Sequence, residues 1–182
     1  MKNNIKKLFL AGLFAIICGA GAAFANGLDN RDAVGVYVLG AEKPVGGIQY
    51  EHRYTDFISN KFGAFIFYDN DSYTDPLDMN FTVETDFTLY ASEWKEKIAS
   101  RLFAYALVGY TACITKSYDY NSSTPSLKTE TFVSNAVASL GFGFDFTFFG
   151  HLSIPVQFGF MGTFPQDTQI GFCGGIGLRY AW

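Results

Sequence analysis

Residues 169–182 alternate between large apolar side chains and small or polar ones, and this pattern limits what the chain can fold into. Ile176 and Leu178 are large and apolar, whereas Gly177 and Arg179, next to them in the sequence, are small or charged. Successive side chains of a β-strand point to opposite faces of a sheet, so the segment predicts a strand with one apolar face. A chain in which this pattern recurs belongs to the all-β class.

The alternation does recur along most of the chain. The segments that show it, clearly or weakly, are 33–41, 47–54, 61–69, 80–91, 101–115, 131–148, 152–164 and 169–182. Several short strands separated by turn-forming residues are typical of an antiparallel sandwich or barrel. Beyond the first 25 residues, no apolar run is long enough to predict a membrane-spanning helix.

The less apolar faces of these strands distinguish two kinds of barrel. A soluble lipocalin-like barrel and a membrane barrel both have one apolar and one polar face, and they differ in which face points outward. The less apolar face of the last strand is rich in glycine, and Gly141 and Gly143 take the same face of segment 131–148. Such small residues suit the cramped interior of an eight-stranded barrel, which leaves the apolar faces to lipid. The sequence therefore predicts an eight-stranded antiparallel transmembrane β-barrel.

The N-terminal residues differ in character from the rest. Three lysines precede an apolar run that ends in the small-x-small triplet Ala23-Phe24-Ala25. This arrangement is typical of a secretory signal peptide cut before Asn26, which implies export through the Sec translocon. A lipoprotein anchored through Cys18 is the alternative, although a bulky residue precedes that cysteine. We expect residues 1–25 to be the signal peptide and 26–182 to form the barrel.

The charge and the composition of the exported part exclude several kinds of partner. Loss of residues 1–25 removes three of the 13 Lys and Arg residues and none of the 17 Asp and Glu residues, which leaves a net charge of −7. An acidic chain is a poor binder of nucleic acid, so no such partner is expected. Two histidines and two separated cysteines give no cluster with zinc-ligand spacing, and we expect no metal or other cofactor.

Cys113 and Cys173 lie in the exported part of the chain. Oxidising compartments favour disulfides, so the location alone predicts a bridge. However, both residues fall on the interior face of strands that are not neighbours, the fifth and the eighth, so their Cα atoms lie beyond the roughly 7 Å that a disulfide spans. We therefore expect two free thiols.

The final segment resembles a known assembly signal. From Gly175 to Trp182 the sequence is similar to the C-terminal signal of bacterial outer-membrane proteins, with Gly177, Tyr180 and Trp182 at its glycine and two aromatic positions and Gly175 at a position that is usually polar. The resemblance implies a small barrel of the OmpA, OmpX and OmpW kind, inserted into the cell outer membrane by the barrel-assembly machinery and surrounded by outer-membrane lipid. A further possibility is that these aromatic residues only mark the lipid interface, as they do at many strand ends.

The connections follow from this topology. With a periplasmic N-terminus, the outer loops are expected at 42–46, 69–80, 116–130 and 165–168, and the inner turns at 55–60, 92–100 and 149–151. The segment 92–100 is long for a turn, and we expect a short helical turn within it.

Six charged residues fall on the predicted interior faces. They are Glu51, Arg53, Glu84, Asp86, Asp145 and Arg179. Charges inside a barrel must be paired or hydrated, and a paired network would plug the bore. Two interpretations follow: a scaffold in which salt bridges satisfy buried charge, or a gate that conducts.

An enzyme is the alternative function. His151 and Ser153 have the H-x-S spacing of the lipid A deacylases, which are outer-membrane barrels, and residues two apart on a strand share a face. A serine nucleophile also needs an orienting carboxylate near its base. The family's Asn-Gly is replaced by Ile154-Pro155, and the only later acid is Asp167. We therefore expect a protein that is not an enzyme, with a structural, adhesive or small-solute-passing role at the cell surface and an oligomeric state left open.

Overall fold

The computed structural model describes residues 29–40, 44–68, 77–94, 97–119, 126–166 and 168–182. The predicted signal peptide lies outside the described residues. Within them, no helix is long and apolar enough to cross a membrane.

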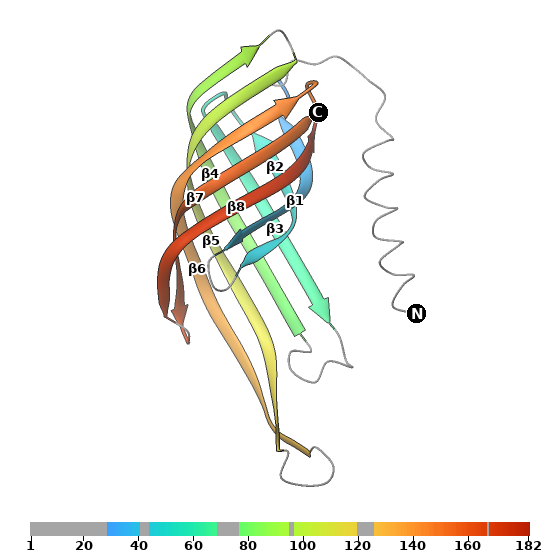
Figure 1. The fold of residues 1–182 in the computed structure, drawn as a ribbon, viewed down its shortest axis with the longest axis vertical. Helices are drawn as coiled ribbons and strands as arrows, with labels where there is room; N and C mark the ends of the chain where they lie inside the picture. The colour runs from blue at the N-terminus through green and yellow to red at the C-terminus, as the bar shows by residue number, and fades with distance from the viewer. Residues whose placement is uncertain (1–28, 41–43, 69–76, 95–96, 120–125, 167) are drawn as a thin grey trace, which may run out of the picture.

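Eight antiparallel strands form one closed barrel in which each strand pairs with the next and β8 pairs with β1 (Figure 1). The strands are β1 (Asp32–Gly40), β2 (Val45–Arg53), β3 (Ile58–Tyr68), β4 (Leu77–Trp94), β5 (Ile98–Asp119), β6 (Ser126–Phe148), β7 (Leu152–Pro165) and β8 (Gln169–Ala181). The predicted number of strands and the predicted fold class are confirmed.

The middle strands are longer than predicted. The segment 116–130, expected as an outer loop, is strand over most of its length, because β5 continues to Asp119 and β6 begins at Ser126. Segment 92–100, expected as an inner turn, is also strand over most of its length, because β4 reaches Trp94 and β5 begins at Ile98. The Lys97 amide donates to the Trp94 carbonyl at 3.2 Å, and residues 95–96, where the short helical turn is expected, lie outside the described residues. Backbone pairing does not require an apolar face, so a strand can continue where the alternation of side chains fades.

The strands are strongly staggered. A row of paired residues that starts at Asp32, the first residue of β1, ends on β8 at Phe172. Phe172 comes two residues before Gly174, which is the partner of Gly40 at the far end of β1. The row passes through His52, Asn60, Thr85, Ala106, Leu140 and Phe160. A closed barrel with this stagger has tilted strands, so each row of paired residues climbs the wall.

The apolar faces point outward, as predicted. Leu140, Phe160 and Ile170 expose 67%, 65% and 73% of their surface, whereas Lys61 and Arg179 on the inner face expose 1% each. This distribution is the reverse of that in a water-soluble protein, where large apolar side chains are buried and charged ones face solvent.

Glycines in β6 make room for rings inside the barrel. Gly143 pairs with Phe103 and Gly141 pairs with Tyr105 across the β5–β6 ladder. A Cβ atom added to Gly141 would lie 2.8 Å from a ring carbon of Tyr105 and equally close to the backbone of Gly159. The small residues of the interior face therefore leave room for two buried aromatic side chains inside the barrel.

Candidate functional site

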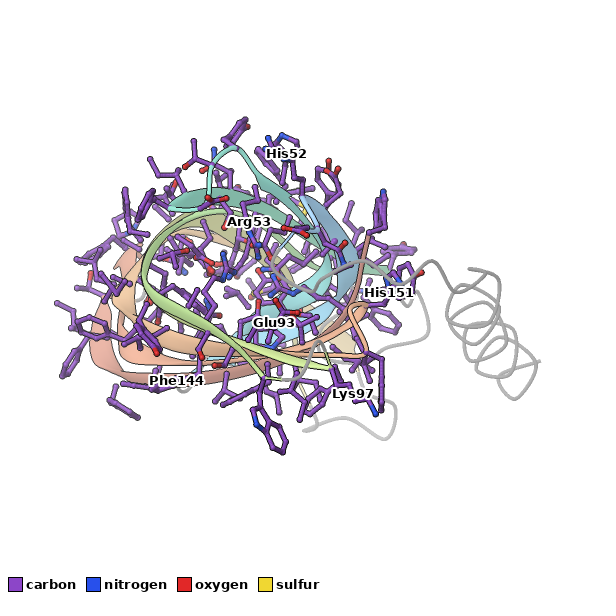
Figure 2. The ribbon with its side chains drawn as sticks, turned by 90° about the horizontal axis from the view of Figure 1, so that it is seen from above. His52, Arg53, Glu93, Lys97, Phe144 and His151 are labelled. Atoms are coloured by element: carbon purple, nitrogen blue, oxygen red, sulfur yellow. The ribbon has the colours of Figure 1, made fainter. Side chains whose placement is uncertain are left out.

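The interior side chains form two layers. At the end of the barrel where β8 finishes, the Trp182 end, lies the lumen charge cluster of Glu51, Lys61, Glu84, Asp86, Arg101, Asp145 and Arg179. Toward the opposite end, where β5 turns into β6, lies the apolar layer of Tyr37, Leu39, Val45, Phe103, Tyr105, Leu107, Val137, Met161 and Cys173. Figure 2 looks into the barrel from the Trp182 end.

Arg179, on β8, bonds to side chains from three other strands of the barrel. Its guanidinium is paired with Glu51 of β2 and donates to Asp145 of β6 at 2.5 Å. It also donates to Ser153 of β7 at 3.2 Å, and that hydroxyl donates to Asp145 at 2.5 Å. Four strands are therefore connected through one side chain.

Arg101 repeats this role from β5. One of its terminal nitrogens lies 2.9 Å from Glu51 and 3.3 Å from both Asp86 and Asp145, and the other donates to Ser59 at 3.2 Å. Glu51 and Asp145 are thus each shared by two arginines, which couples the pairs into one network.

Lys61 completes the cluster on β3. Its ammonium lies 2.6 Å from Glu84 and 2.7 Å from Asp86, which are two apart on β4 and face the same side. Gln157 of β7 donates to Glu84 at 2.5 Å. The ring of Phe103 borders the cluster, with its centroid 4.5 Å from the Lys61 nitrogen and 5.0 Å from the Arg101 guanidinium carbon. These distances are those of cation–π contacts between the two layers.

The cluster is close to electrical balance. Four carboxylates and three cations each expose less than a tenth of their surface, and half-buried Arg53 lies on the same interior face nearer the Trp182 end. Removing water from an ion is costly, so each buried charge depends on its partners and on added hydrogen bonds. The cluster has both, in the hydroxyls of Ser59 and Ser153 and the amide of Gln157.

Of the six charges assigned to the interior from the sequence, five are in the cluster. Arg53 is the sixth, and Figure 2 shows it within the ring while His52 lies outside it. It lines a pocket of about 10 Å³ that also borders Glu51 and Asp145, a volume at the lower limit for one water molecule.

Sequence reasoning missed Lys61 and Arg101. Segments 61–69 and 101–115 carry apolar residues on both faces, so alternation did not show which face is interior. The charge itself was the available signal, because a Lys or Arg facing lipid near the bilayer midplane costs about 2–4 kcal/mol.

The apolar layer contains a few polar atoms that are hydrogen-bonded to one another. The Tyr105 hydroxyl lies 3.2 Å from the Ser139 hydroxyl and 3.6 Å from the Cys173 sulfur, and the Tyr37 hydroxyl is bonded to Thr82. Cys173 is fully buried on β8, while Cys113 is on β5. Both cysteines are free thiols, as predicted from the strand order.

His151 and Ser153 are not arranged as a catalytic pair. His151 precedes β7, its ring stacks on Tyr180 with centroids 5.2 Å apart, and its Nδ1 lies 2.8 Å from the Ala181 carbonyl oxygen. Ser153 is inside the barrel, hydrogen-bonded to Asp145. His151 lies in the turn expected at 149–151 and is therefore at the rim rather than on β7. The lipid A deacylase alternative has no support.

The residues assigned to the assembly signal lie along the seam between β8 and β1. Tyr180 and Trp182 stack with ring centroids 6.3 Å apart, and Trp182 exposes half of its surface. The backbone of Trp182 exchanges two hydrogen bonds with Asp32, of 2.9 and 3.2 Å. Gly177 is buried, and a Cβ atom there would lie 3.0 Å from the Pro155 ring. Among the described residues, no group of three or more His, Cys, Asp or Glu side chains could hold a metal ion.

Comparison with solved structures finds the same fold in known barrels. The solution structure of outer membrane protein H (OprH) from Pseudomonas aeruginosa superposes with a TM-score of 0.52 at 12% identity, covering 84% of this chain and 99% of that one. The N-terminal barrel domain of P. aeruginosa OprF gives 0.49 at 10% identity, with 84% and 98% covered, and Ail of Yersinia pestis gives 0.42 at 10%, with 84% and 97% covered. No protein-family model matches the sequence, and neither does any curated protein. The fold assignment rests on the OprH superposition and the eight-stranded closed sheet.

Proposed function

We propose, from the eight-stranded barrel fold that the chain shares with outer membrane protein H, that this protein spans a bacterial outer membrane. It is a barrel with a closed lumen that presents the end of its β5–β6 hairpin outside the bilayer. The Sec translocon and the barrel-assembly machinery are its partners during biogenesis.

One observation carries the membrane location: the outer wall is apolar and the interior holds the charges. Phe158, Phe160 and Phe172 are among the large apolar side chains exposed around the wall, while the cations of the lumen charge cluster are buried. A soluble monomer rarely exposes an apolar patch larger than a few hundred Å². Lipid, by contrast, is the natural surrounding of a closed barrel, in which each strand pairs with a neighbour on both sides.

The filled interior favours a structural role over solute passage. Arg101 and Arg179 bridge opposed strands in one layer, and Phe103 and Leu107 are buried in the other. An eight-stranded barrel has room for little more than its own side chains, so a solute would have to displace both layers.

The β5–β6 hairpin is the best candidate for an adhesive surface. Within the described residues, β4 pairs with β5 as far as Ile114, and β7 pairs with β6 from Asn135. Beyond these residues the two strands form a ribbon that projects from the barrel (Figure 1). Strand edges such as those of this ribbon are a common means of contact between proteins, because a partner can add a strand to them.

Reconstitution tests the proposal. The refolded chain should float with phospholipid vesicles, migrate faster on a gel before boiling than after it, and resist protease except in the β5–β6 ribbon. Recovery of a folded, monomeric protein in detergent-free buffer would contradict the membrane location.

A further inference from the structure

The outer wall contains a groove that the closed-lumen role does not use. It crosses β2, β3, β4 and β5, is largely open along the wall, and has a volume of about 750 Å³. Its floor is formed by small residues, Ala64 with Gly63 and Gly109. Its apolar lining includes Ile48, Phe62, Phe81, Val83 and Val108.

A row of polar side chains runs along the groove on its Trp182 side. Asp32, His52, Asn60 and Thr85 are consecutive partners across β1, β2, β3 and β4, and all four lie on the outer face. The next row of outward residues begins at Tyr50 and belongs to the groove. Polar groups at this level of a lipid-facing wall need polar partners.

The polar row combines an acid with hydrogen-bond donors. Asp32 accepts the Tyr50 hydroxyl at 2.5 Å and lies 2.8 Å from Nδ1 of His52, and its side chain keeps 28% of its surface exposed. The Asn60 carbonyl oxygen accepts the Thr85 hydroxyl at 3.1 Å, which leaves the Asn60 amide N–H groups as donors toward a ligand. His52, with 36% of its side-chain surface exposed, presents its second ring nitrogen.

We propose that this groove and the polar row form a binding site for a zwitterionic phospholipid of the phosphatidylethanolamine type. An acyl chain lies over Ala64 between Phe62 and Phe81, the phosphate meets His52 and Asn60, and the ammonium meets Asp32. The inference rests on the proposed membrane location and adds a specific lipid to it.

Charge complementarity selects this occupant. A purely anionic headgroup would bring its negative charge close to the Asp32 carboxylate with no ammonium to compensate for it. An ethanolamine headgroup offers both signs, and its ammonium can donate hydrogen bonds to the carboxylate, which a quaternary choline cannot. The groove is also continuous with the apolar wall that faces lipid tails, so an acyl chain can enter it from the bilayer.

Native mass spectrometry of the full chain in nanodiscs tests the site. The discs contain equal parts of dioleoyl phosphatidylethanolamine and phosphatidylglycerol, and in a second series the ethanolamine lipid is replaced by phosphatidylcholine. In the first series we expect about fivefold more ethanolamine lipid than glycerol lipid to be retained, which is the ratio that one net hydrogen bond provides. In the second series we expect a smaller ratio of choline lipid to glycerol lipid. Equal retention of the three lipids would overturn the proposal.

Three variants separate the parts of the site. Ala64→Phe places a ring where the acyl chain lies over Ala64 and should abolish lipid retention at the site, whereas Asp32→Asn should keep retention and remove the headgroup preference. Val156→Phe adds a ring to the outward face of β7 on the other side of the barrel and should behave as the parent. Unchanged retention in Ala64→Phe would refute the site. A dimer that forms in the parent and is lost in Ala64→Phe would also refute it, because a second copy of the chain would then occupy the groove.

Gel mobility before and after boiling is measured on the same samples. A chain that fails to insert into the discs contradicts the proposed membrane location. A chain that inserts without any lipid preference contradicts only the phospholipid site.

Discussion

Single residues in the lumen charge cluster have large effects on stability because they share partners. Arg179→Met would remove one of the two guanidinium groups, those of Arg101 and Arg179, that pair with both Glu51 and Asp145. Breaking a buried ion pair on one side typically costs about 3–5 kcal/mol. We expect a loss of this size in urea unfolding from vesicles, and a change within about 0.5 kcal/mol for Arg31→Met, whose side chain is exposed near the rim. Equal effects of the two variants would mean that the cluster adds no stability.

Glycines of the interior face are not equivalent. A Cβ atom at Gly141 would clash with the backbone of Phe158 and Gly159 on β7, whereas one at Gly171 would meet nothing within 4 Å. Gly141→Ala should therefore destabilise the barrel by about 1–3 kcal/mol, as overpacking does. Gly171→Ala should be neutral or slightly stabilising, because it restricts the unfolded chain. The unfolding midpoints of the two variants check this, and the reverse order would contradict the packing of β6 against β7.

The β5–β6 hairpin divides into a part that builds the barrel and a part that does not. Lys116 and Glu130 are cross-strand partners beyond the last contacts with β4 and β7. Replacing residues 117–129 by Asn-Gly should join them through a tight two-residue turn. We expect the trimmed chain to insert into vesicles with the yield and unfolding midpoint of the parent. Loss of insertion would show that the ribbon takes part in forming the barrel, and the matched control is the same Asn-Gly insertion without deletion.

Strand order keeps the cysteines apart. Cys113 pairs with Asp78 and Val133 on its two neighbouring strands, and Cys173 pairs with Gly159 on β7. Alkylation in denaturant without reductant should label both thiols. In the folded protein, fully buried Cys173 should resist a reagent that labels half-buried Cys113. A Cys113–Cys173 bridge found by mass spectrometry would require a different order of strands.

The molecule as a whole should conduct poorly. The lumen charge cluster and the apolar layer both occupy the bore, and the pocket at the Trp182 end has room for about one water molecule. Planar-bilayer recordings on refolded protein should therefore show no large steady conductance. A steady open level in each inserted barrel would contradict the closed lumen and leave the membrane location intact.

The sequence determined the class of fold and the orientation of its faces. In β8, small or charged residues alternate with large apolar ones. Because successive side chains of a strand point to opposite faces, the two kinds of residue must lie on opposite faces of the sheet. This alternation therefore assigned Glu51, Asp145 and Arg179 to the interior. The alternation did not assign Lys61 or Arg101 to the interior, because their strands carry apolar residues on both faces. It also underestimated the lengths of β5 and β6, in which backbone pairing continues where the alternation fades.

The tertiary structure alone decided which charges meet and where the outer wall is hollow. Arg179 and Glu51 are 128 positions apart and become partners because β8 closes onto β1, which in turn pairs with β2. The row from Asp32 to Thr85 gathers four residues from four strands in the same way. Periodicity acts within a strand, whereas these contacts depend on the stagger between strands, and that stagger is fixed only when the sheet closes into a barrel.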